Sequence, residues 1–100
     1  MIDKTDIYGI DRNYFDIIGE KDYGIVLRSQ CTGHYWYLLE QEYNGHKSYQ
    51  IYHRHHASNP YHLQKNRPTV EDCCEYIRSH DAYHLQKMKR KEERRQKKFY

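Results

Sequence analysis

Histidine is the side chain best suited to chemistry in this sequence, with 8 among 100 residues. On a strand, His53 and His55 would point to the same face, about 7 Å apart along the chain. Two imidazoles so placed can share a divalent ion, with His62 as a third ligand and one position left for water. The pattern is therefore compatible with a site for zinc or another divalent metal at His53, His55 and His62.

A second pair of histidines, His80 and His84, has i, i+4 spacing on a predicted helix and is also compatible with metal binding. The alternative interpretation treats all these histidines as polar, partly exposed aromatic residues. The sequence favours this alternative, because it holds no His-Glu-x-x-His motif, no Cys-x-x-Cys motif and no acidic residue beside residues 53–56. We therefore expect no cofactor, and zinc or another divalent metal is kept as the second hypothesis.

A metal-dependent nuclease of the His-Asn-His type is the enzymatic alternative, since that class combines a hairpin, a loop and a helix. His55 and His56 would be its paired histidines, and Asn59 or Asn66 its middle residue. Its last ligand should lie early in the helix, where residues 70–72 are Val-Glu-Asp. Because this spacing departs from the type and its usual glycines are missing, we expect a protein without catalytic residues.

The three cysteines give little support to nucleophilic catalysis. Cys31 lies three residues before His34 in a predicted turn, and a lowered thiol pKa would require that imidazole close by. Cys73 and Cys74 are adjacent and fit small core residues. An odd number of cysteines predicts no disulfide framework and favours a reducing cytosol.

Charge is divided unevenly along the chain. Residues 1–50 carry five Lys/Arg against eight Asp/Glu, and residues 51–100 carry twelve against six, so the halves have net charges of −3 and +6. From residue 85 onward eight basic residues face two acidic ones; the basic residues are Lys87, Lys89, Arg90, Lys91, Arg94, Arg95, Lys97 and Lys98. This excess predicts contact with a polyanion or an acidic partner, and a merely solvated helix is the alternative.

Nucleic-acid binding has the strongest physical argument among the function classes. Basic side chains that neutralise phosphates release counterions, and aromatic rings can stack on bases. The predicted binding residues outside the basic end are Arg54, Lys65, Arg67, Tyr35, Tyr37, Tyr52, Tyr61 and Tyr83.

A sheet must position most of these side chains. Strand-like patterns occupy residues 14–18, 23–28, 35–42 and 48–55. Asn44-Gly45 is a strong hairpin signal, because both residues tolerate positive φ in a type I′ turn. Segments so closely spaced can pair only antiparallel, which predicts a meander of three or four strands. Alternation with period two places Trp36 and Ile51 on the buried face.

A helix is predicted after a loop over residues 57–68. Thr69 fits an N-cap residue, with Asp72 at the N3 position. An apolar stripe that can lie on the sheet follows at Val70, Cys73, Cys74 and Ile77. Beyond Ser79 the stripe weakens, so the remaining helix should protrude from the body.

The predicted fold class is α+β, an antiparallel three- to four-stranded meander packed by one C-terminal helix with a basic helical extension. Residues 1–13 form a lead-in, 14–84 a single domain and 85–100 the basic tail. The longest apolar run has five residues, 35–39, against the roughly 20 that a bilayer span needs. Nine charged residues are spread over the first 22 positions, a pattern that predicts no secretory signal. We therefore expect a cytoplasmic protein with no membrane partner.

Residues 14–84 also carry five short motifs. They are Tyr14-Phe15-Asp16-Ile17-Ile18, Thr32-Gly33-His34-Tyr35-Trp36, Tyr52-His53-Arg54-His55-His56, Asn59-Pro60-Tyr61-His62 and Ser79-His80-Asp81. With these motifs the chain resembles small uncharacterised proteins of phages and conjugative elements from anaerobic Gram-positive bacteria. The layout of residues 34–80 is similar to the arm-binding domains of tyrosine integrases, which place a sheet face in the DNA groove. The basic tail departs from the first resemblance.

These resemblances imply a mobile-element protein in a bacterial host. The function we expect is non-catalytic binding of nucleic acid or of a complex that handles nucleic acid. The alternative is a host-defence inhibitor of the anti-CRISPR type, which would occupy a protein surface on a CRISPR effector. The two differ in whether nucleic acid itself is the partner.

Overall fold

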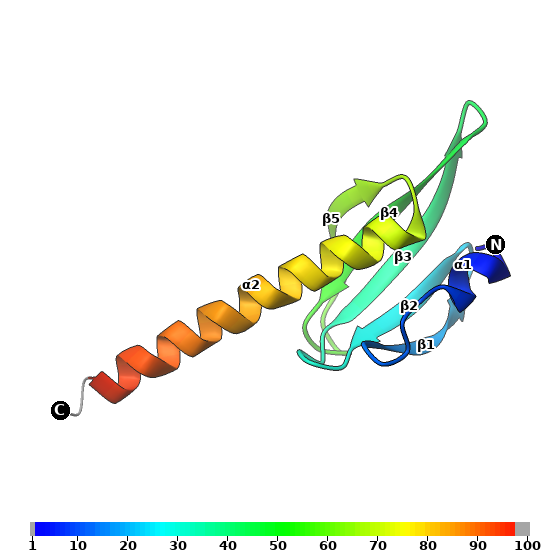
Figure 1. The fold of residues 1–100 in the computed structure, drawn as a ribbon. Helices are drawn as coiled ribbons and strands as arrows, with labels where there is room; N and C mark the ends of the chain where they lie inside the picture. Colours follow the sequence, from blue (N-terminus) through cyan, green and yellow to red (C-terminus); the bar gives the residue numbers. More distant parts are fainter. Residues whose placement is uncertain (1, 98–100) are drawn as a thin grey trace.

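The chain folds into an antiparallel sheet with one long helix, as seen in a computed structural model that describes residues 2–97 and the side chains of residues 2–95 (Figure 1). Five strands follow one another in the order β1-β2-β3-β4-β5. They are β1 (Phe15–Lys21), β2 (Gly24–Ser29), β3 (Tyr35–Tyr43), β4 (His46–Arg54) and β5 (His62–Arg67). The helices are α1 (Lys4–Tyr8) and α2 (Val70–Lys97). The α+β prediction is confirmed, with five strands in place of three or four.

The β3–β4 hairpin turns where the sequence predicted it. Asn44 has φ 51° and Gly45 has φ 78°, and these two residues connect the closing pair Tyr43↔His46. A two-residue turn with positive φ at both positions matches the right-handed twist of the strands it joins. From this turn the pairing runs without interruption to Tyr35↔Arg54.

Strand β5 corrects the prediction of a continuous loop over residues 57–68. Residues 62–67 pair with β4, and a register shift at Ile51/Tyr52 marks a bulge. The side chains of β5 are exposed, apart from the half-buried Arg67, so the strand shows no apolar alternation. Its pairing satisfies the backbone groups along the edge of β4, which side-chain patterns do not reveal.

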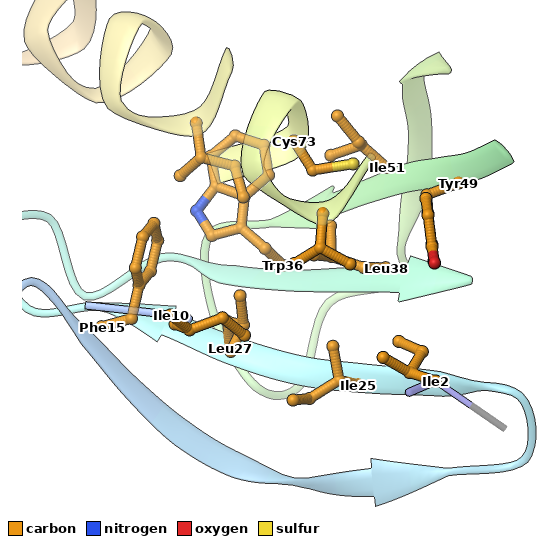
Figure 2. Packing of buried hydrophobic residues seen from close by; sticks show 12 residues of the cluster. Ile2, Ile10, Phe15, Ile25, Leu27, Trp36, Leu38, Tyr49, Ile51 and Cys73 are labelled. Atoms are coloured by element: carbon orange, nitrogen blue, oxygen red, sulfur yellow. The ribbon is translucent and has the colours of Figure 1, made fainter. Parts of the chain in front are cut away.

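The hydrophobic core lies on one face of the sheet (Figure 2). Trp36 and Ile51 are fully buried there, as the alternation predicted. The segment before β1 contributes Ile2 and Ile10, so residues of the predicted lead-in pack into the same core. Both helices lie on this face, and no helix of residues 2–97 covers the other one.

Helix α2 begins as predicted and then leaves the body. The backbone amide of Asp72 donates to the Thr69 hydroxyl oxygen at 3.0 Å, which makes Thr69 the N-cap. Val70, Cys73 and Ile77 are buried against the sheet. The helix continues unbroken to Lys97, and the molecule is 60 Å long in that direction (Figure 1). Across residues 2–97, no helix combines the length and the apolar composition that a membrane span requires.

Candidate functional site

Five histidines from three parts of the chain meet between the sheet and α2. His34 precedes β3, His53 lies near the end of β4, His55 directly follows β4, and His80 and His84 come from α2. We call these five residues the histidine cluster. His34 and His53 are buried, while His55 is exposed and gives the cluster an opening to solvent.

The strand side of the cluster is the tightest. His53 Nε2 lies 3.0 Å from His34 Nδ1. The His34 and His55 rings stack with centroids 4.0 Å apart and planes 10° apart. Each of these three side chains offers a nitrogen, and the three nitrogens lie within 4.8 Å of one another.

The helix side closes over these rings. The His84 ring centroid lies 4.6 Å from that of His34, and the His80 centroid lies 4.9 Å from that of His53. Trp36 supports both sides, stacked on His53 at 4.0 Å and edge-on to His80 at 5.2 Å. His80 Nδ1 is buried and has no hydrogen-bond partner among the described residues.

A fully buried carboxylate, Asp81, fixes the loop that carries His34. It accepts hydrogen bonds from the Tyr14 hydroxyl at 2.6 Å and from the Thr32 hydroxyl at 3.4 Å. The Thr32 oxygen in turn accepts from the backbone amide of His34 at 3.2 Å. Burial, and then the bond to Asp81, raise the pKa of Tyr14, so this phenol keeps its proton. Asp81 therefore anchors the loop that carries His34, through the Thr32 side chain.

The buried imidazoles are neutral at pH 7. Burial, and then the neighbouring imidazoles, lower the pKa of His53 to about 3 and that of His34 to about 4. Burial also lowers the pKa of His80. A neutral imidazole has a free nitrogen lone pair, which is the form that binds transition metals.

The predicted metal residues are partly brought together. His53 and His55 belong to the histidine cluster, whereas His62 lies on β5 opposite His53, is exposed, and is not one of the three residues that share the 4.8 Å group. The residue that completes the group is His34, which the sequence connected only with Cys31. The pair Tyr35↔Arg54 lies at the open end of the β3–β4 hairpin, and the next position along places His34 opposite His55. The register of the hairpin could therefore have identified His34 as a neighbour of His55.

Among the described side chains, no hydrogen bond joins a cysteine to a histidine, as the catalytic pair of a cysteine nucleophile would require. The Cys31 thiol donates weakly to the Tyr14 oxygen at 3.5 Å and to Asp81 at 3.9 Å. Burial raises the pKa of Cys73 to about 12 and that of Cys74 to about 11, so both thiols stay protonated. All three cysteines are free.

The predicted nucleic-acid residues divide among three places. The first is the part of α2 from residue 85 to 97, which we call the basic arm. Within it Lys87, Arg90, Lys91 and Arg94 are exposed and, at i, i+3, i+4 and i+7, share one helix face. Lys89 and Arg95 are exposed on other faces, and Tyr83 is exposed just before the arm. The Lys97 side chain and all of Lys98 lie outside the described residues.

The second place is the open face of the sheet, which carries half-buried tyrosines. The Arg54 guanidinium lies over Tyr61 at 4.2 Å and over Tyr35 at 5.2 Å. Tyr37 lies 6.0 Å from both Tyr52 and Tyr61, measured between ring centroids. These rings and the guanidinium contact one another, so they form a packed aromatic surface.

The third place is β5. Lys65 pairs with the buried residue Ile51 and is exposed, and Arg67 lies over the Tyr76 ring of α2 at 5.4 Å. Arg67 is thus engaged with the helix. The structure does not bring these two residues together with the basic arm into one continuous surface.

Comparisons with protein-family models, curated proteins and solved structures found no match to this chain. The site geometry alone therefore carries the functional argument.

Proposed function

We propose that this protein is a non-catalytic binder of duplex DNA, and that the basic arm contacts the phosphate backbone. The observation that carries the proposal is the single exposed face of Lys87, Arg90, Lys91 and Arg94 on a helix that nothing else in residues 2–97 covers. None of the three ion pairs among the described side chains involves the arm. The positive charge is therefore free to meet phosphates.

The dimensions of the arm favour a duplex. Thirteen helical residues extend about 20 Å, and a helix is about 10–12 Å wide with its side chains. The major groove of B-form DNA is about 12 Å wide and accepts a helix, whereas the major groove of A-form RNA is narrow. DNA carries one negative charge per about 1.7 Å, so four basic residues on one face find several phosphates within reach.

The test is DNA binding as a function of salt. Fluorescence anisotropy with a labelled duplex would compare the wild type with K87A/R90A/K91A/R94A. The matched control removes the same charge from exposed residues of the body, as K4A/R12A/K21A/K47A. If the arm neutralises four phosphates, the arm variant should lower the slope of log K against log salt by about 3–4, and the control should leave that slope nearly unchanged.

Two outcomes would contradict the proposal. One is the lack of any binding to duplex DNA at low salt by the wild type. The other is an equal loss of affinity in both quadruple variants, which would reflect net charge and not the arm. The mobile-element origin, a CRISPR-effector target and a cytoplasmic location in a bacterial host stay predictions.

A further inference from the structure

We propose that His34, His53 and His55 bind one zinc ion, with water in the fourth position. The three side chains reach the same point from the loop before β3 and from the end of β4. This site is separate from the basic arm, and the argument for it rests on distances, burial and donor chemistry.

The distances are close to those of a zinc site. Zinc–nitrogen bonds of about 2.0–2.1 Å in a tetrahedron place neighbouring ligand nitrogens about 3.3 Å apart. His34 Nδ1 and His53 Nε2 are 3.0 Å apart, and all three donor nitrogens lie within 4.8 Å of one another. The widest pair must therefore close by about 1.5 Å at most. Because an imidazole lone pair lies in the ring plane and the His34 and His55 rings are stacked with planes 10° apart, the exposed His55 ring must rotate out of this stack to reach the ion.

Packing already orients two of the three rings. Trp36 stacks on the His53 ring at 4.0 Å, and Thr32, bonded to Asp81, holds the backbone of His34. Such supporting contacts fix ligand orientation in metal sites and lower the cost of assembling them. A hydrogen bond between His34 and His53 would engage one nitrogen on each of these two rings and would leave His55 without a role. A bound ion would engage the same two nitrogens and a nitrogen of His55 as well.

The donor set selects the class of metal. Three imidazoles suit zinc and its transition-metal neighbours, whereas magnesium and calcium require oxygen ligands. Three protein ligands with one open position are typical of zinc sites that hold a water molecule. The opening at the exposed His55 gives that water its access to solvent.

Zinc binding is tested with untagged full-length protein after removal of metal by a chelator. Isothermal titration with zinc chloride should give one ion per chain. The informative variant is H55A, because His55 is exposed and its removal should leave the fold intact by circular dichroism. The matched control is H46A, another exposed histidine, at the far end of β4. We expect H55A to lower zinc affinity at least about tenfold and H46A to leave it unchanged.

Two further measurements locate the ion. The single tryptophan, Trp36, is stacked on His53, so cobalt(II) in the site should quench its fluorescence and show the visible absorption of a tetrahedral complex. H62A separates this site from the set His53, His55 and His62, because only the latter needs His62. We expect H62A to bind zinc like the wild type.

The proposal is overturned if the wild type binds no zinc, if H55A binds as tightly as H46A, or if H62A loses the ion. None of these results bears on DNA binding, because no residue of the basic arm is a ligand. Conversely, failure of the arm variants to change DNA affinity leaves the metal site untouched.

Discussion

The imidazole of His53 stacks on the indole of Trp36, with ring centroids 4.0 Å apart and planes 16° apart. The two residues are direct partners across β3 and β4, and both are buried. One face of the His53 ring therefore belongs to the hydrophobic core, while its Nε2 reaches His34. Any change of charge on this ring acts on the stability of the whole sheet.

Acid should destabilise the metal-free protein. The pKa of His53 is lowered to about 3 and that of His34 to about 4, both chiefly by burial, from an ordinary value of 6.5. Below pH 6.5 the unfolded chain binds protons that the folded chain does not. The stability is therefore complete above pH 6.5 and decreases as the pH falls toward 4. Between pH 7 and pH 5 each ring should cost about 2 kcal/mol of unfolding free energy, measured by urea denaturation.

The pH effect has its own control variants. The other titratable groups around the two rings are His55, His80, His84 and Asp81, of which Asp81 acts in the opposite direction on His34. H53F keeps an aromatic ring against Trp36 but takes up no proton, so the share of this ring, about 2 kcal/mol between pH 7 and pH 5, should disappear. H46A should retain all of it. Equal stability of the wild type at pH 5 and pH 7 would contradict the prediction.

The bond between Tyr14 and Asp81 should be a strong contribution to stability. The hydroxyl lies 2.6 Å from a carboxylate that is fully buried. Hydrogen bonds to charged groups contribute about 1.5–3 kcal/mol, and Y14F should lower the unfolding free energy by that amount. The substitution keeps the aromatic ring and its packing on Arg78, whose guanidinium lies 4.5 Å from the ring centroid of Tyr14. A double-mutant cycle with D81N measures the coupling, and a value near zero would refute this account.

The hairpin explains how much of the site the sequence could predict. Asn44-Gly45 identifies the turn, and the turn fixes every later pair of β3 and β4, including Trp36↔His53. The position of His34 opposite His55 follows from the same counting. The sequence does not reveal it, because residues 31–34, Cys-Thr-Gly-His, indicate a turn and not the continuation of a strand.

Other features depend on tertiary contacts that no local pattern carries. The i, i+4 spacing of His80 and His84 places them on one helix face, but only the crossing of α2 over the sheet brings them to the strand histidines. Strand β5 is defined by backbone pairing along β4, since its side chains are polar and mostly exposed. The pattern that revealed the inner strands is therefore missing there.

The Asn44-Gly45 turn between β3 and β4 allows a direct test of the contribution of backbone conformation to stability. Gly45 has φ 78°, and a Cβ added there would meet no atom within 4 Å. Any loss of stability in G45A must therefore come from the left-handed backbone, and we expect about 1 kcal/mol by thermal or urea denaturation. G19A is the control, because Gly19 also has open space around it but no positive φ. The explanation fails if the two substitutions have the same effect.

Alanine substitutions of Arg54 and Lys91 should have separate effects, the first mainly on the stability of the fold and the second mainly on DNA binding. The Arg54 guanidinium lies between the Tyr61 and Tyr35 rings, at 4.2 Å and 5.2 Å, on the sheet face away from α2. Cation–π contacts contribute about 0.5–2 kcal/mol, so R54A should lower the unfolding free energy by about 1 kcal/mol. Because its charge is stacked between rings, R54A should change DNA affinity less than K91A does. K91A, at an exposed position of the basic arm, should leave the melting temperature unchanged and lower the salt slope by about 1. If R54A weakens DNA binding as much as K91A at equal salt, the open sheet face is part of the DNA-binding surface and the basic arm is only one portion of it.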